Sequence, residues 1–215
     1  MEKENKVKGY LILAGVGAII IGAIIYFVYI NGYSRAIPGI RSPLQTAVGE
    51  QVQTIQKGDY TVSIKYKYSY DIEALVVHTR DYSGSSLDDM LSPKDLALAW
   101  GIAAELNDKV DFRWNQGERF YSFYAGEEVL QMAGSVDNIT RHSSNNHIIP
   151  SNDDIKGKVM RIRRGDHIRL KGYLVNVDAV RTDGYRYHWY SSTVRDDTGH
   201  GACEVFYVTE VEWLD

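Results

Sequence analysis

The stretch YTVSIKYKYSY, residues 60–70, decides the fold class. In it tyrosine, valine and isoleucine alternate with threonine, serine and lysine. A period of two residues indicates a β-strand with one buried side and one solvent-facing side. IEALVVHT, residues 72–79, follows almost at once and is apolar enough for a central strand. This part of the chain is therefore predicted to build a sheet.

More strands are expected toward the C-terminus. HIRLKGYLVNVDAV, residues 167–180, is predicted to form a long strand in which Gly172 marks a bulge or a bend. YRYHWYSS, residues 185–192, would return as its hairpin partner after a turn. Residues 202–214 alternate again and would close the sheet. Two short strands joined by a turn at 115–117 are expected at 110–114 and 118–125.

The main soluble helix is predicted at SPKDLALAWGIAAELND, residues 92–108. Ser92 suits the N-cap and Pro93 the first helical position. Leu96 and Trp100 then share one face, which would pack on the sheet. A shorter helix behind Asn152–Asp154 would end at Gly165. The predicted class is α+β and β-rich: one compact antiparallel sheet or partial barrel domain with one main helix.

The N-terminal part predicts a membrane anchor. Residues 10–30 carry no charge, and about 20 helical residues span about 30 Å of hydrocarbon. The apolar core is longer than that of a signal peptide and ends in bulky aromatic residues, which favours an uncleaved, single-pass signal anchor. Lys3, Lys6 and Lys8 precede it, whereas Arg35 and Arg41 follow it. This small excess of basic residues places the N-terminus in the cytoplasm.

The predicted organisation has four parts: a cytoplasmic N-terminus at 1–9, a transmembrane helix at 10–30, a connector at 31–57 and an extracytoplasmic β-rich domain at 58–215. The connector could hold a short helix at 46–56. The location would be the inner or plasma membrane. Ala14, Ala18 and Gly22 lie four residues apart, a spacing that lets two membrane helices approach, so that a homodimer is possible. A net charge of −4 gives no reason to expect nucleic acid as a partner.

Several short motifs resemble those of an uncharacterised family of bacterial single-pass membrane proteins. They are DLALAWG (95–101), Gln116 with Arg119, HSSNNHIIP (142–150), GDHIRLKGYLV (165–175) and SSTVRDDTGHGACE (191–204). The last follows a pattern of Ser-Ser, Arg, Asp-Thr-Gly and Ala-Cys-Glu. The resemblance implies a bacterial membrane protein and brings no activity with it. A short helix before GDHIRLKGYLV is also similar to the strand entry of the OB-fold.

A cysteine nucleophile is one functional hypothesis. Cys203 is the only cysteine, His147 or His142 could act as its base, and Asp197 or Asn145 could orient that base. The order of anchor, histidine and cysteine is similar to that of sortases, the membrane-anchored cysteine transpeptidases. Sortases carry Thr-Leu-x-Thr-Cys and an arginine after the cysteine; this chain has neither, and Arg195 precedes Cys203. The alternative interpretation is a small buried cysteine at the start of a strand.

A metal site is not predicted, nor is a cofactor. His142, His147, His200, Asp197 and Glu204 are possible ligands, but their spacing fits no zinc motif.

The favoured hypothesis is a binding or assembly domain with an unknown ligand or protein partner. In HSSNNHIIP, Asn145 and Asn146 would form a polar loop tied to its own backbone. Trp189, Ser191 and Ser192 would add aromatic and polar surface. The alternative is a cysteine-dependent hydrolase or transpeptidase that uses Cys203 and His147.

Overall fold

The computed structural model describes residues 10, 13–25, 35–194 and 203–214. The chain divides into two compact units, residues 1–34 and residues 35–215. Residues 13–25 of the first unit form a helix. Within the described ranges, no helix combines the length and the apolar character needed to cross a membrane. Residues 11–12 and 26–30 of the predicted span lie outside the described residues.

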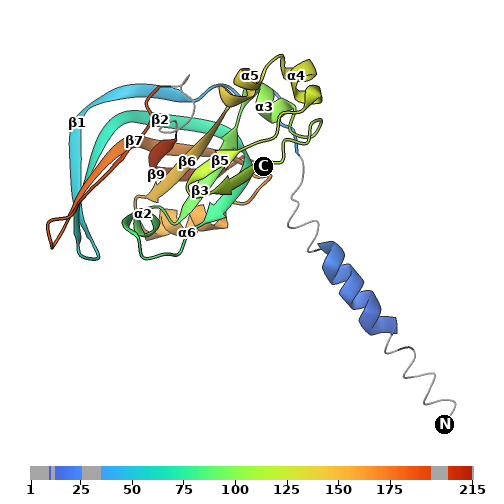
Figure 1. Ribbon diagram of the computed structural model, residues 1–215, viewed down its shortest axis with the longest axis horizontal. Coiled ribbons are helices and arrows are strands. Elements are labelled where there is room, and N and C mark those ends of the chain that lie inside the picture. The colour runs from blue at the N-terminus through green and yellow to red at the C-terminus, as the bar shows by residue number, and fades with distance from the viewer. Residues whose placement is uncertain (1–9, 11–12, 26–34, 195–202, 215) are drawn as a thin grey trace, which may run out of the picture. The chain divides into compact units, whose positions relative to one another are not determined.

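Seven strands of the second unit form one mixed sheet in the order β1-β2-β3-β6-β9-β7-β8 (Figure 1). They are β1 (Leu44–Lys57), β2 (Tyr60–Asp81), β3 (Lys94–Ala99), β6 (Ser143–Pro150), β7 (His167–Arg181), β8 (Arg186–Tyr190) and β9 (Glu204–Trp213). All neighbours are antiparallel except β6 and β9. Because β2 also pairs with β7, the pairings β2-β3-β6-β9-β7 return to β2. The α+β, strand-rich class is thus confirmed.

β2 is one continuous strand that contains both stretches predicted as strands, 60–70 and 72–79. Val62 and Ile64 are buried on one side of it, as the alternation predicts, whereas Tyr70, beyond a register shift between Tyr66 and Tyr68, is buried in the other apolar cluster. Its N-terminal neighbour is β1, which occupies most of the expected connector. The short helix expected at 46–56 is therefore wrong, because these residues pair along the edge of β2. The compact unit already begins at residue 35.

The helix predicted at 92–108 is also wrong. Its first half is β3, which lies between β2 and β6 and is buried along its whole length. A strand buried on both faces is apolar on both, so Leu96 and Trp100 matched a helical spacing by coincidence. Only α3 (Gly101–Glu105) is helical here. It begins at Gly101, whose φ of +47° suits glycine.

The remaining elements lie around the sheet. They are α2 (Leu87–Leu91), β4 (Asn115–Gly117), β5 (Phe120–Ser122), α4 (Glu127–Ala133), α5 (Val136–Thr140) and α6 (Asp153–Arg161). The expected strand at 110–114 is irregular, and the expected turn at 115–117 is β4, which pairs with β5. Figure 1 shows α2 and α6 at one end of the sheet and α3, α4 and α5 at the other. The short helix behind Asn152 is confirmed, since the Asn152 side chain accepts from the backbone N–H of Ile155, but it ends at Arg161 and not at the expected Gly165.

The apolar residues form two clusters on opposite sides of the sheet. Leu98, Trp100 and Phe206 belong to the larger cluster. Val62 and Val177 belong to the smaller one. The predicted bulge at Gly172 is confirmed by a register shift between β7 and β9. A Cβ atom at Gly172 would overlap the backbone oxygen of Tyr207.

Candidate functional site

The motif HSSNNHIIP is a central strand, not a loop. Residues 143–150 form β6, which pairs with β3 on one edge and with β9 on the other. Its polar side chains are buried, which is tolerated where they find hydrogen-bond partners inside the protein. Asn145 and His147 lie on the same face as Ile149, whereas Asn146 lies on the opposite face with Ile148. The prediction of a self-bonded loop is therefore wrong.

Arg119 is the centre of a charged cluster on the face of Asn145 and His147. Its guanidinium donates to Asp89 at 2.5 Å and to Asp95 at 2.7 Å. It also donates to the backbone oxygen of Ser92 at 3.0 Å, and Asp88 lies 3.6 Å from its Nε. Asp95 is completely buried, and only 13% of the arginine side chain is exposed. This cation thus stabilises three carboxylates that would otherwise repel one another.

His147 joins this cluster from β6. Its Nδ1 lies 3.0 Å from Oδ2 of Asp95, although the ring is not aimed along a hydrogen-bond direction. The imidazole packs against the indole of Trp189, with ring centroids 4.9 Å apart. The Arg119 guanidinium lies 3.5 Å from the ring centroid of Tyr82 and 5.7 Å from that of Trp189. The cluster therefore lies between aromatic rings, which strengthens its electrostatic interactions by excluding water.

A second hydrogen-bonded chain leads from Cys203 to His78. The Asn145 amide donates to the backbone oxygen of Arg119 at 2.9 Å and points toward the Cys203 sulfur at 3.8 Å. The Asn145 side-chain oxygen accepts from Gln116 at 2.6 Å, and the oxygen of Gln116 accepts from His78 at 3.0 Å. Burial holds the pKa of His78 below its usual value, so that its neutral form is favoured.

The structure brings together several of the residues proposed from the sequence. Asn145, His147, Trp189 and Cys203 all lie around Arg119. Ser192 is adjacent, since its N–H donates to the backbone oxygen of Cys203. The Ser191 hydroxyl accepts from the backbone N–H of Val205, two residues after Cys203. No hydrogen bond joins His147 to Cys203, both of which the structure describes.

Other proposed residues lie elsewhere. The ring of His142 donates to the backbone oxygen of Asn138 at 2.7 Å, next to α5. Asn146 donates to the Ser144 hydroxyl on the core-facing side of β6. Arg195 and Asp197 lie outside the described residues, as does His200. Among the residues with described positions, no three histidine, cysteine, aspartate or glutamate side chains are arranged to hold a metal ion.

Two central members of the cluster were not singled out from the sequence. Asp95 lay inside the helix predicted at 92–108, and Arg119 was named only as part of a resemblance. The available signal was a charge next to an apolar run: Asp95 directly precedes LALAW, residues 96–100, and is buried because the run is a strand. A buried carboxylate requires a cationic partner.

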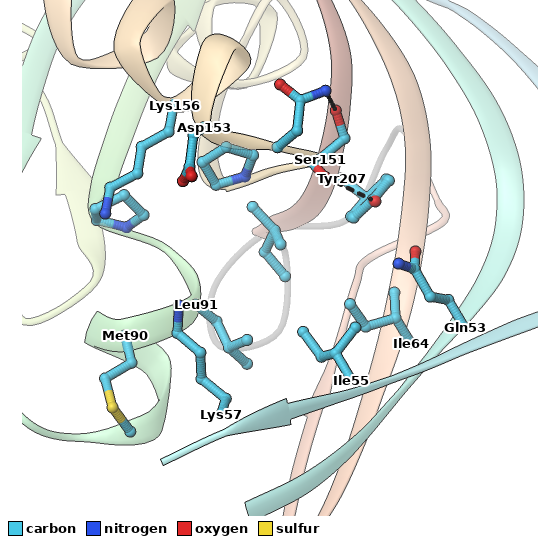
Figure 2. Close-up of a pocket in the computed structure, with 14 residues that line it drawn as sticks. Gln53, Ile55, Lys57, Ile64, Met90, Leu91, Ser151, Asp153, Lys156 and Tyr207 are labelled. Carbon is cyan, nitrogen blue, oxygen red and sulfur yellow. Dashed lines mark hydrogen bonds between the residues drawn. The ribbon is translucent and has the colours of Figure 1, made fainter.

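A pocket of about 150 Å³ lies at the other end of the same face of β6. Figure 2 shows Ile55 and Ile64 along its floor, with Met90 and Leu91 at its side and Lys156 and Asp153 at its rim. Its lining comes from segments far apart in the sequence: Gln53, Ile55, Lys57, Ile64, Met90, Leu91, Pro93, Ile149, Pro150, Ser151, Asn152, Asp153, Lys156 and Tyr207. The floor belongs to the smaller apolar cluster.

Helix α2 links the pocket to the charged cluster. Asp88 and Asp89 contact Arg119, while Met90 and Leu91 line the pocket. The cluster therefore holds in place the helix that forms one wall of the pocket. Comparison of the chain with protein-family models, with curated protein sequences and with solved structures finds no match.

Proposed function

We propose that this chain is a membrane-anchored, extracytoplasmic binding or assembly domain whose ligand occupies the pocket beside α2 and α6. One observation supports this most directly. Four segments that are distant in the sequence build a pocket with an apolar floor and a polar rim. Such a combination is typical of ligand sites, in which apolar contact supplies affinity and a few polar groups supply orientation.

The charged cluster acts as the frame of this site. Arg119 joins α2, through Asp88 and Asp89, to the central strand β3, through Asp95. Its nearest donor groups are occupied by these carboxylates, which leaves it poorly suited to bind a ligand directly. A rigid scaffold under a binding loop or short helix is a common arrangement.

The pocket is tested with the full-length chain in lipid nanodiscs, labelled with ¹³C at isoleucine methyl groups. We expect some members of a library of small, water-soluble fragments to shift the methyl signals of Ile55, Ile64 and Ile149. The signals of Ile72 in the larger apolar cluster should stay unchanged. Ile55→Trp fills the pocket and should abolish the shifts, while Val52→Trp, at an exposed position of the same strand, should not. A library without any binder would refute the proposal.

The anchor and the orientation are part of the same proposal. Residues 10–30 are uncharged, and a cytoplasmic N-terminus puts the sheet domain outside the cytoplasm. In a Cys203→Ser background, Asp183→Cys at an exposed turn should react with an impermeant maleimide in intact cells. Lys3→Cys should react only after lysis. The opposite pattern would reverse the orientation. A homodimer through the small-residue stripe of the anchor remains part of the proposal.

The closed series of strand pairings supports a finer statement about shape. We infer that β2, β3, β6, β9 and β7 form the partial barrel expected from the sequence, because the pairings of these five strands return to β2. Closure of this kind removes open strand edges from the core of the domain.

A cysteine-dependent hydrolase or transpeptidase is the second candidate. The observation in its favour is that the side-chain amide of Asn145 lies within reach of both the Cys203 sulfur and the backbone oxygen of Arg119. Asn145 itself is two residues before His147 in the same strand. An activated thiolate requires a base or a cation in contact with the sulfur. If Cys203 is catalytic, iodoacetamide should alkylate it rapidly at pH 7, and His147→Gln should slow the reaction. Alkylation at the rate of an ordinary thiol, unchanged in His147→Gln, would remove this candidate.

A further inference from the structure

The rim of the pocket carries two lysines without ion-pair partners among the described residues. Lys57 ends β1, and Lys156 lies on α6. The ion pairs of the neighbouring lysines go elsewhere: Lys158 pairs with Asp154, and Lys65 with Asp178. Figure 2 shows the Lys57 and Lys156 side chains reaching toward the same side of the pocket.

One carboxylate shares the lining with these two cations. Asp153 begins α6, and it is the one acidic side chain among the described residues that line the pocket. Two lysines against one aspartate give the described part of the lining one net positive charge. An apolar pocket with a cationic rim favours a ligand that places an anionic group beside the ammonium groups.

The size of the pocket limits the apolar part of such a ligand. A pocket of about 150 Å³ has room for a short branched alkyl group. Ile55, Ile64 and Ile149 supply the apolar contacts, while Gln53 and Ser151 offer polar groups at the edge.

We propose that the pocket binds a short, branched apolar group that bears a carboxylate. A free branched-chain carboxylic acid and the C-terminal leucine or valine of a polypeptide share this chemistry. The carboxylate lies between the ammonium groups of Lys57 and Lys156, and the alkyl group contacts the three isoleucines. This inference rests on the proposed binding function and names the class of ligand.

The test compares three probes of one shape: 4-methylpentanoate, 4-methylpentan-1-ol and 4-methylpentan-1-amine. Each is titrated into the full-length chain in nanodiscs of uncharged lipid, and binding is measured from the methyl signals of Ile55, Ile64 and Ile149. We expect the acid to bind about tenfold more tightly than the alcohol, and the amine to bind least. An acid that binds no more tightly than the alcohol overturns the proposed ligand class.

Charge variants locate the carboxylate. Lys57→Gln and Lys156→Gln should each weaken binding of the acid about threefold and leave binding of the alcohol unchanged. Lys67→Gln, at an exposed position of β2, is the matched control and should change neither. Lysine variants that leave the affinity for the acid unchanged would place the anion elsewhere and overturn the inference.

Two further comparisons distinguish a free acid from a polypeptide C-terminus as the ligand, and a wrong ligand class from a wrong binding function. A tetrapeptide with a free C-terminal leucine is compared with its amide. Tighter binding of the free peptide than of 4-methylpentanoate assigns the site to a polypeptide end; weaker binding assigns it to a free acid. If all three small probes bind alike, the pocket is a binding site but the carboxylate class is wrong. If neither these probes nor the fragment library bind, the binding function itself is refuted.

Discussion

Replacing Arg119 by methionine should be among the most destabilising changes in this domain. The guanidinium contacts Asp89 and Asp95, and Asp95 is fully buried. Methionine retains much of the apolar stem but leaves these carboxylates facing one another, with only the Ser92 hydroxyl and His147 beside Asp95 among the described residues. Removing one partner of a buried ion pair costs about 3–5 kcal/mol. That is a large part of the 5–15 kcal/mol by which typical domains are stable.

Urea unfolding followed by tryptophan fluorescence measures this loss. With a slope of about 2 kcal/mol per molar, the unfolding midpoint of Arg119→Met should fall by about 1.5–2.5 M. The control is Arg169→Met, which removes a partly exposed ion pair with Asp71. Pairs of that kind contribute about 0–1 kcal/mol, so the midpoint should move by at most about 0.5 M.

A double-mutant cycle tests the reason for the loss. In Arg119→Met combined with Asp95→Asn, the buried carboxylate is gone, so the double variant should lose less stability than the sum of the single variants. Strict additivity, or a loss below about 1 kcal/mol for Arg119→Met, would show that Arg119 does not compensate the charge of Asp95.

Three further changes test other parts of the fold. Gly172→Ala should cost about 1–3 kcal/mol, because its Cβ would overlap the backbone of Tyr207; calorimetry would show the lower melting temperature, and an unchanged one would contradict the bulge. Asn152→Ala removes the N-cap of α6 and should cost about 1 kcal/mol in urea unfolding, whereas Asn152→Asp should retain most of the stability. Burial raises the pKa of Tyr121 to about 12, so the folded state holds this proton more tightly than the unfolded chain. Stability should therefore be complete below about pH 10 and fall as the pH rises toward 12, and Tyr121→Phe should flatten this fall in unfolding curves measured across that range.

The local sequence pattern was sufficient to predict strands in which buried and solvent-exposed residues alternate. Alternate residues of 60–70 are more buried than their neighbours, first in the smaller apolar cluster and, after the register shift at 66–68, in the larger one, and residues 167–180 repeat the alternation in β7. The helix α6 was also predictable, since Asn152 caps it and Ile155 and Val159 share its buried face. In each case the residues that determine the element are close together in the sequence, so that the pattern can be recognised without the fold.

Local pattern failed where both faces of a strand are buried. Residues 94–99 are apolar enough for a helix or a strand, and only pairing with β2 and β6 decides between them. The polar strand 143–150 was harder still. Asparagine and histidine are typical of loops in a sequence. They are accommodated in this strand because the fold brings their partners, such as Gln116 and Asp95, close to them.

The candidate site shows the same division. Asn145, His147, Trp189 and Cys203 were proposed from residue type alone, and they lie near one another. The cation that organises them, Arg119, contacts acidic residues 24 to 31 positions earlier in the chain. No periodicity in the sequence links residues at that separation. The pocket was not foreseen, because the segments that line it meet only in the folded domain.

The length of β2 has a consequence for the order in which this domain can form. Its partner β7 lies on the order of 100 residues later in the chain, and closing such a separation is slow. The β1–β2 hairpin leaves the ribosome well before β7 does. One edge of β2 therefore stays unpaired until β7 has been synthesised. During synthesis that edge is an open template for other strands. A chain cut short before residue 181 should therefore be prone to aggregation instead of folding as a smaller domain.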